Sequence, residues 1–182
     1  MNRALIIHAW DESPQACWYT WLKYELEARG YDVMVPAMPE PDVPKIEPWV
    51  ATLQQLLPNP NEDVLLVGHS VGCQAILRYM AELSDEQSVG QVILVAPWTH
   101  LINLDPESQQ IAKLWLETPL DWDKIKAHCG SFVALFSDDD EWVPLTEEKI
   151  FREKLGAETR VLHQMGHFDA VDTLQEVLRL VQ

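Results

Sequence analysis

The stretch Glu62-Asp63-Val64-Leu65-Leu66-Val67-Gly68-His69-Ser70-Val71-Gly72 decides how this chain folds. Residues 63–67 form a short run of mostly branched apolar side chains, which is typical of a β-strand buried on both faces. After the second glycine, apolar residues recur at three- and four-residue spacing through residue 83, a pattern that predicts an amphipathic helix. A glycine-x-serine-x-glycine pattern between a buried strand and a helix indicates a sharp turn that exposes the serine hydroxyl.

The same alternation of strand and helix patterns extends outward from this stretch in both directions. Strands are predicted at residues 4–8, 31–35, 63–67, 91–95, 132–136 and 159–162. Helices are predicted at residues 17–29, 47–57, 71–83, 146–155 and 169–181. Such alternation implies right-handed crossovers, so we expect a three-layer, Rossmann-like α/β sandwich around a mostly parallel sheet of about six strands.

The segment from Pro97 to His128 breaks this alternation. It contains three prolines, at residues 97, 106 and 119, and two short helical patterns, at residues 109–116 and 122–128. Because it is too long for an ordinary loop, we expect a small lid or side wall. No linker or internal repeat divides the 182 residues, so the chain is expected to form one domain over residues 1–182.

Charge and cysteine content narrow the classes of function. The formal net charge of −16 would repel phosphate backbones and anionic lipids, which argues against nucleic-acid and membrane-surface partners. Cys17, Cys73 and Cys129 are odd in number and form no CxxC pair, which argues against a disulfide scaffold or a zinc site. The apolar run at residues 4–7 is too short for a signal peptide, and no stretch approaches a membrane span. We expect a cytoplasmic protein without a metal or cofactor.

Ser70 is the candidate nucleophile. Gly68 and Gly72 lack the β-carbons that would clash in a tight strand-to-helix turn. That turn would aim the backbone N–H of Val71, at the positive end of the helix, at the oxygen of an incoming carbonyl. The alternative is a tight turn with a capping serine, but the strand before it and the helix after it favour the nucleophile.

A serine nucleophile needs a base, and His167 is placed best for it. It lies in Gly166-His167-Phe168, after the last predicted strand and before the last predicted helix. A loop there would bring it to the carboxyl edge of the sheet. The other histidines lie at strand ends, inside the turn or beside the lid segment: His8, His69, His100, His128 and His163.

The third group, a carboxylate that orients the base, is expected directly after the fifth predicted strand. Asp138, Asp139 and Asp140 follow one another there, and residue type alone does not choose among them. A calcium loop is excluded because no glycine and distal glutamate complete its pattern. The two remaining aspartates would be solvated loop residues or caps.

The loop after the first strand should supply a second oxyanion donor, for which the backbone N–H of Trp10 is the candidate, opposite Val71. Trp10, Trp98 and Trp142 all follow predicted strands at the same end of the sheet. They are either core residues or the lining of an apolar acyl pocket, with Trp98 and Trp142 as the substrate-binding candidates.

Together these residues resemble the small serine hydrolases of the YdeN type, the group that includes the retinoblastoma-binding serine hydrolase. The resemblance spans essentially the whole chain and rests on the serine turn and on segments 18–22, 38–41, 122–126, 137–144 and 166–168. It implies an α/β-hydrolase sheet with a minimal lid, and an acid four residues before the proline of a D-x-x-V-P pattern. That acid is Asp140. Glu141 replaces the proline common after the acid, and Ala9 stands where many hydrolases have glycine.

These observations predict a serine hydrolase that cleaves small carboxylic esters, or amides, through Ser70, His167 and Asp140. A rival hypothesis is a protein-binding module with a vestigial or secondary active site, which the acidic surface and the family's name as a binding protein suggest. An acyltransferase that uses an acceptor other than water would share the same three residues.

Overall fold

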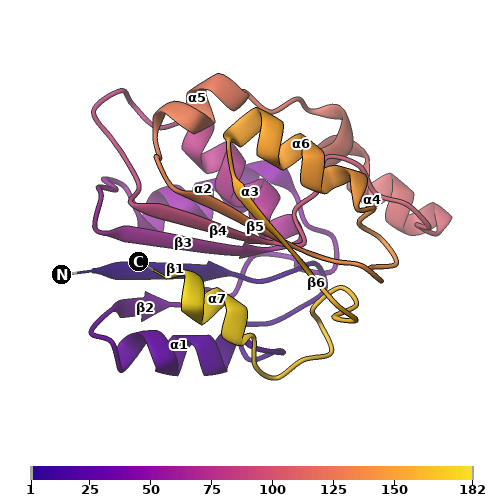
Figure 1. Cartoon of the computed structure of the whole chain (residues 1–182). Coiled ribbons are helices and arrows are strands. Elements are labelled where there is room, and N and C mark those ends of the chain that lie inside the picture. The colour runs from indigo at the N-terminus through magenta and orange to yellow at the C-terminus, as the bar shows by residue number, and fades with distance from the viewer. Residues whose placement is uncertain (1, 182) are drawn as a thin grey trace.

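Six parallel strands form the centre of the computed structural model, which describes residues 2–181 (Figure 1). The strands are β1 (Arg3–Ile7), β2 (Asp32–Met34), β3 (Val64–His69), β4 (Gln91–Val95), β5 (Phe132–Ser137) and β6 (Glu158–Leu162). Their order in the sheet is β2-β1-β3-β4-β5-β6, and every neighbouring pair is parallel. The predicted parallel sheet is confirmed. Because all strands run the same way, the loops at their carboxyl ends share one edge.

Helices cover both faces of this sheet. They are α1 (Tyr19–Glu27), α2 (Ile46–Leu56), α3 (Val71–Ala81), α4 (Pro106–Glu117), α5 (Trp122–Ala127), α6 (Thr146–Leu155) and α7 (Gln175–Leu180). Figure 1 shows α1 and α7 together on one face, and α2, α3, α5 and α6 on the other. Helix α4 lies beside the carboxyl edge, within the segment expected to be a lid.

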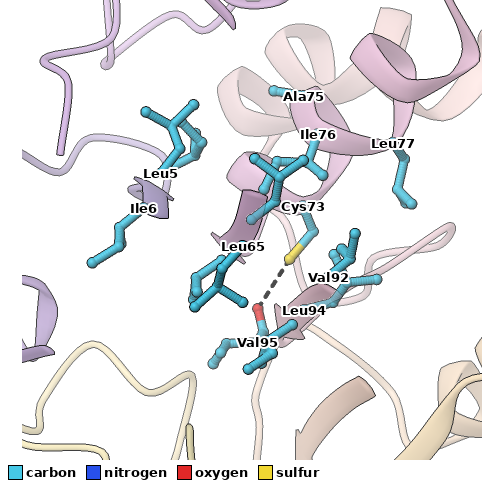
Figure 2. Close-up of a cluster of buried hydrophobic side chains, with 14 of the residues drawn as sticks. Leu5, Ile6, Leu65, Cys73, Ala75, Ile76, Leu77, Val92, Leu94 and Val95 are labelled. Carbon is cyan, nitrogen blue, oxygen red and sulfur yellow. Dashed lines mark hydrogen bonds between the residues drawn. The ribbon is translucent and has the colours of Figure 1, made fainter. Parts of the chain in front are cut away.

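The core is densest where α3 crosses the central strands. Strand β3 is buried along its whole length, and α3 is buried from Val71 to Met80. Figure 2 shows apolar side chains of α3 packed over β3 and β4, with the Cys73 thiol donating a 3.3 Å hydrogen bond to the carbonyl oxygen of Val95. The serine before this helix is therefore positioned by closely packed, buried elements.

The main departure from the predicted elements is at the end of the chain. The apolar spacing predicted a helix over residues 169–181, but α7 begins only at Gln175. Asp169, Asp172 and Thr173 precede it, and such short polar side chains favour turns over helix. In the other direction, α4 is longer than predicted because the Asp105 carboxylate caps it by accepting from two backbone N–H groups.

None of the helices within residues 2–181 combines the length and apolar character that crossing a membrane would require.

Candidate active site

Ser70 occupies a strained turn between β3 and α3. Its φ is 51° and its ψ is −116°, a conformation that residues with a β-carbon rarely adopt. A β-carbon at Gly68 would lie 2.8 Å from the backbone nitrogen of Cys73, and one at Gly72 would lie 2.3 Å from the carbonyl oxygen of Ile7. The two glycines therefore allow α3 to approach β1 and β3 closely enough to form the turn.

The candidate oxyanion donors lie on either side of this turn. Val71 is the first residue of α3, and Trp10 lies in the loop that follows β1. Among the hydrogen bonds formed within residues 2–181, none uses the backbone N–H of either residue. Trp10 lines the cleft described below, whereas Val71 is buried and is not among the residues that line it.

His167 and Asp140 form a buried pair across the loops that follow β6 and β5. The distance between His167 Nδ1 and Asp140 Oδ2 is 2.8 Å, and the side chains are 10% and 2% exposed. The other oxygen of Asp140 accepts from the backbone N–H groups of Trp142 and Val143, at 2.9 and 3.0 Å. These bonds fix the carboxylate so that its free oxygen faces the imidazole.

The two neighbouring aspartates hold the backbone of the histidine loop instead. Asp138 accepts from the backbone N–H of Gln164 at 2.9 Å, and Asp139 accepts from that of Gly166 at 2.8 Å. The bond from Gln164 lowers the pKa of Asp138, and the bond from the Ser137 hydroxyl lowers that of Asp139. Three adjacent residues of one type thus have three different partners, and only Asp140 contacts His167.

Ser70 and His167 line the same cleft, which has a volume of about 400 Å³. Within the described residues no hydrogen bond joins the two side chains. Instead, the Ser70 hydroxyl oxygen accepts a 3.3 Å hydrogen bond from the indole nitrogen of Trp98. Trp142 also lines the cleft and meets the His167 ring edge-on, with ring centroids 5.0 Å apart.

The structure places Trp98 differently from Trp10 and Trp142. Its ring is buried, with 1% exposure, and it does not line the cleft. The side-chain amide of Gln74 in α3 donates to the Trp98 carbonyl and holds this segment in place. Trp98 therefore contacts the serine from the core, while Trp10 and Trp142 lie where the sequence placed them, at the carboxyl edge.

The walls of the cleft are partly apolar and strongly acidic. Leu101, Leu104 and Ile111 contribute apolar surface from the lid segment and α4. Six carboxylate residues also line it: Asp11, Glu12, Asp42, Asp105, Glu107 and Asp169. Burial, together with the charge of Asp169, raises the pKa of Glu12. No lysine or arginine among the described residues lines this cleft.

Two hydrogen bonds join residues 102 and 103 to the loop that follows the three aspartates. The N–H of Ile102 donates to the carbonyl of Trp142 at 2.9 Å, and the side chain of Asn103 donates to that of Glu141 at 2.8 Å.

Within residues 2–181 no group of three or more histidine, cysteine, aspartate or glutamate side chains is arranged to hold a metal ion.

Sequence reasoning missed one part of the site, which is the surroundings of His69. This histidine follows Gly68 in the turn, and its Nδ1 lies 2.6 Å from the hydroxyl of Tyr19 in α1. Its Nε2 lies 2.6 Å from the backbone carbonyl oxygen of His167. Nothing in the sequence signals a contact between residues 50 and 98 positions apart.

A parallel sheet covered by helices on both faces, with a serine on a strained turn after a central strand, defines the α/β hydrolases. The particular family follows from comparison with known proteins. The chain belongs to the serine hydrolase family, whose model matches residues 4–178. Membership of that family makes this protein a hydrolytic enzyme, as the sequence predicted.

The sequences of individual relatives align with nearly the whole of this chain. YdeN of Bacillus subtilis (strain 168) is 31% identical over 167 residues, which cover 92% of this chain and 86% of the relative. The serine hydrolase RBBP9 of Rattus norvegicus is 28% identical over 166 residues, covering 91% and 84%. The crystal structure of the B. subtilis ydeN gene product superposes with a TM-score of 0.89 at 28% identity, covering 98% of this chain and 96% of that one. The family resemblance is thereby confirmed.

Proposed function

We propose that this enzyme hydrolyses small carboxylic esters through an acyl-enzyme formed on Ser70. The observation that carries the proposal is the buried pair of His167 and Asp140, which opens into the same cleft as the serine. A nucleophile, a base and an oriented carboxylate from three separate loops at one sheet edge form the arrangement that acyl transfer requires.

The hydrogen bond to Asp140 determines which nitrogen of His167 acts as the base. A carboxylate only accepts, so His167 Nδ1 carries a proton and Nε2 of the neutral ring is free to accept one. The indole of Trp98 donates to the Ser70 oxygen, which leaves the hydroxyl proton of Ser70 available for this nitrogen. As the hydroxyl oxygen bonds to the ester carbon, His167 takes its proton, and Asp140 stabilises the resulting imidazolium.

The negative charge of the tetrahedral intermediate collects on the former carbonyl oxygen. We assign its stabilisation to the backbone N–H groups of Trp10 and Val71, which are not engaged elsewhere among the described residues. His167 then passes its proton to the leaving alcohol. Water then attacks the acyl carbon while His167 takes its proton. His167 returns that proton to the Ser70 oxygen as the bond to the acyl carbon breaks, so that the carboxylic acid leaves and Ser70 is regenerated.

The cleft supports a preference for small substrates. A volume of about 400 Å³ accommodates a short acyl chain and a modest alcohol group, and part of that space is bounded by the lid segment. Leu101, Ile111 and Trp142 offer apolar surface for these groups. We therefore propose short-chain esters as the substrate class. We also propose that residues 1–182 belong to one α/β domain, with a small lid segment at residues 97–128.

Turnover of p-nitrophenyl acetate and butyrate by matched serine variants tests the proposal. Ser70→Ala should lower kcat by about 10³-fold or more, because it removes the nucleophile. Ser108→Ala is the control, since Ser108 lines the same cleft from α4 without a role in the reaction. Equal turnover by Ser70→Ala and the wild type would contradict the proposal. A folded wild type with no turnover would also contradict it, and would favour the rival protein-binding role.

A further inference from the structure

A buried chain of hydrogen bonds joins the loop after β1 to the loop after β6. The backbone N–H of Ala9 donates to the Tyr19 hydroxyl at 3.0 Å. That hydroxyl lies 2.6 Å from Nδ1 of His69, and Nε2 of His69 lies 2.6 Å from the backbone carbonyl oxygen of His167. Tyr19 and His69 are both 0% exposed, so water does not compete for these bonds.

The hydrogen atoms in this chain can be assigned because its far end only accepts. The His167 carbonyl has no proton to give, so Nε2 of His69 must donate. Burial and the neighbouring His167 lower the pKa of His69 to about 3, so the ring carries this single proton and Nδ1 is bare. The Tyr19 hydroxyl therefore donates to Nδ1, and its oxygen is free to accept from Ala9. Each of the three hydrogen bonds then has its donor on the Ala9 side and its acceptor on the His167 side.

Each end of the chain reaches a segment that the proposed reaction uses. Ala9 directly precedes Trp10, the second oxyanion donor, and the acceptor at the other end is the backbone of the base itself. The base loop is strained, since Gln164 and Phe168 have φ values of 54° and 64°. The indole of Trp18 holds the next carbonyl of this loop, that of Phe168, at 3.1 Å.

We infer that Tyr19 and His69 are positioning residues. They hold two loops in place relative to Ser70: the oxyanion loop after β1, which carries Trp10, and the base loop after β6, which carries His167. The inference rests on the proposed function, because it gives both residues a task in that reaction. Packing alone gives no reason for a phenol and an imidazole at these sites. Apolar side chains of similar size would fill the same space without the cost of burying polar groups.

The variant Tyr19→Phe tests the inference. It keeps the ring but removes the hydroxyl, so the Ala9 N–H and Nδ1 of His69 lose their partner. We expect kcat for p-nitrophenyl butyrate to fall by about tenfold to a hundredfold, because catalysis is sensitive to small displacements of the reacting groups. KM should stay within about twofold, since the ground-state contacts of the substrate do not change. The control is Tyr24→Phe in the same helix, because the Tyr24 side chain is 64% exposed and takes no part in this series of hydrogen bonds.

A second measurement separates positioning from a role in stability alone. A tetrahedral boronic acid adduct on Ser70 places an oxygen in the oxyanion site, so its affinity for Tyr19→Phe should fall by the same factor as kcat/KM. Both assays are run where circular dichroism shows the variant fully folded. If the folded variant keeps wild-type kcat and boronic acid affinity while only its melting temperature falls, the inference is wrong.

A further variant covers the case in which Tyr19→Phe does not fold. His69→Gln keeps an amide donor for the His167 carbonyl but has no imidazole Nδ1 for Tyr19, and we expect the same selective loss of kcat. Failure of both variants to fold would contradict the inference, because the chain would then be a stability element. If the wild type itself does not turn over esters, the proposed function fails. Wild-type turnover with an unaffected Tyr19→Phe overturns only the positioning role.

Discussion

Neighbouring residues of one chemical type have different tasks in this protein, as the aspartates after β5 show. Asp140 is the one that contacts His167, while Asp138 and Asp139 hold the backbone of the histidine loop. The difference arises because the loop directs only the carboxylate of Asp140 toward the imidazole of His167. A functional comparison of adjacent positions can therefore isolate the role of the carboxylate from the stability of the loop.

Asp140→Asn should lower kcat by about 10³- to 10⁴-fold. The amide keeps the shape of the carboxylate, but it cannot stabilise the imidazolium and it favours the wrong tautomer of His167. The measurement is steady-state hydrolysis of p-nitrophenyl butyrate. Asp139→Asn is the matched control, since its amide oxygen can still accept from the Ser137 hydroxyl and the Gly166 N–H, and it should cost less than about tenfold. Equal losses in the two variants would remove Asp140 from its proposed role.

His69 should make the protein less stable as the pH falls. The folded protein lowers the pKa of this group to about 3, while the ordinary value is 6.5. Below pH 6.5 the unfolded chain binds a proton that the folded chain does not, so the free energy of unfolding decreases toward pH 3. The contribution of this one group has a slope of at most about 1.4 kcal/mol per pH unit.

Urea unfolding at about pH 7 and about pH 4.5 measures this effect. The variant His69→Gln should lose less stability between the two pH values than the wild type does. His163→Gln is a useful comparison, because the hydrogen bond that His163 donates to the Asp138 carboxylate raises the pKa of the exposed His163, and its loss acts in the opposite direction. Identical pH dependence in the wild type and His69→Gln would show that folding does not lower the pKa of His69.

Among the elements, α3 and the turn before it set the geometry of the site. The turn requires that α3 start against the end of β1, and Gly72 is the point of contact. No side chain fits there, because a β-carbon would meet the backbone of β1 rather than a movable side chain.

Gly72→Ala should therefore displace the turn. We expect a loss of about 1–3 kcal/mol in the free energy of unfolding, together with nearly complete loss of ester hydrolysis. Gly130→Ala is the matched control, since a β-carbon at Gly130 meets nothing within 4 Å. Thermal unfolding and turnover of both variants provide the measurement. A fully active Gly72→Ala enzyme would show that the turn tolerates a shift of α3.

The elements also show what local sequence can and cannot predict. Helix α6 was predicted at its observed bounds, because the apolar spacing ends at Gly156, which adopts the left-handed conformation with φ 69°. The start of α7 was not, because apolar residues at 171 and 174 pack against the core without being helical. Periodicity reports which residues face inward, and a turn or a helix can satisfy the same spacing.

The candidate site follows the same division. The turn of Ser70 and the loop of His167 were predictable, since each depends on a strand and a helix next to it in sequence. The residues alone left three aspartates open, because the choice depends on how the loop folds back. The contacts of His69 with Tyr19 and His167 depend on tertiary packing and were not visible.

At the scale of the whole molecule, the net charge of −16 extends into the cleft itself. Carboxylates from the loops after β1, β2 and β6 and from residues 105 and 107 line the cleft, and no lysine or arginine among the described residues lines it. The electrostatic potential in such a cleft is negative, so it repels anions and lowers the rate at which they enter. The charge pattern therefore bears on which esters reach Ser70.

Anionic esters should be poor substrates. We expect kcat/KM for p-nitrophenyl hemisuccinate to be at least about tenfold below that for the butyrate ester, with the gap narrowing as salt is added. Asp169→Asn should raise the value for the anionic ester, because Asp169 lines the cleft. Asp85→Asn changes the net charge equally on a distant exposed loop and should have little effect. Equal use of both esters would contradict this reading of the cleft.

Active-site labelling is the most direct test of whether Ser70 is the nucleophile. The folded wild-type protein is treated with a fluorophosphonate, and the adduct is located by mass spectrometry of its peptides. We predict a single adduct per chain, on Ser70, that is absent from Ser70→Ala and present in Ser108→Ala. An adduct on another residue, or none on the folded protein, would contradict it.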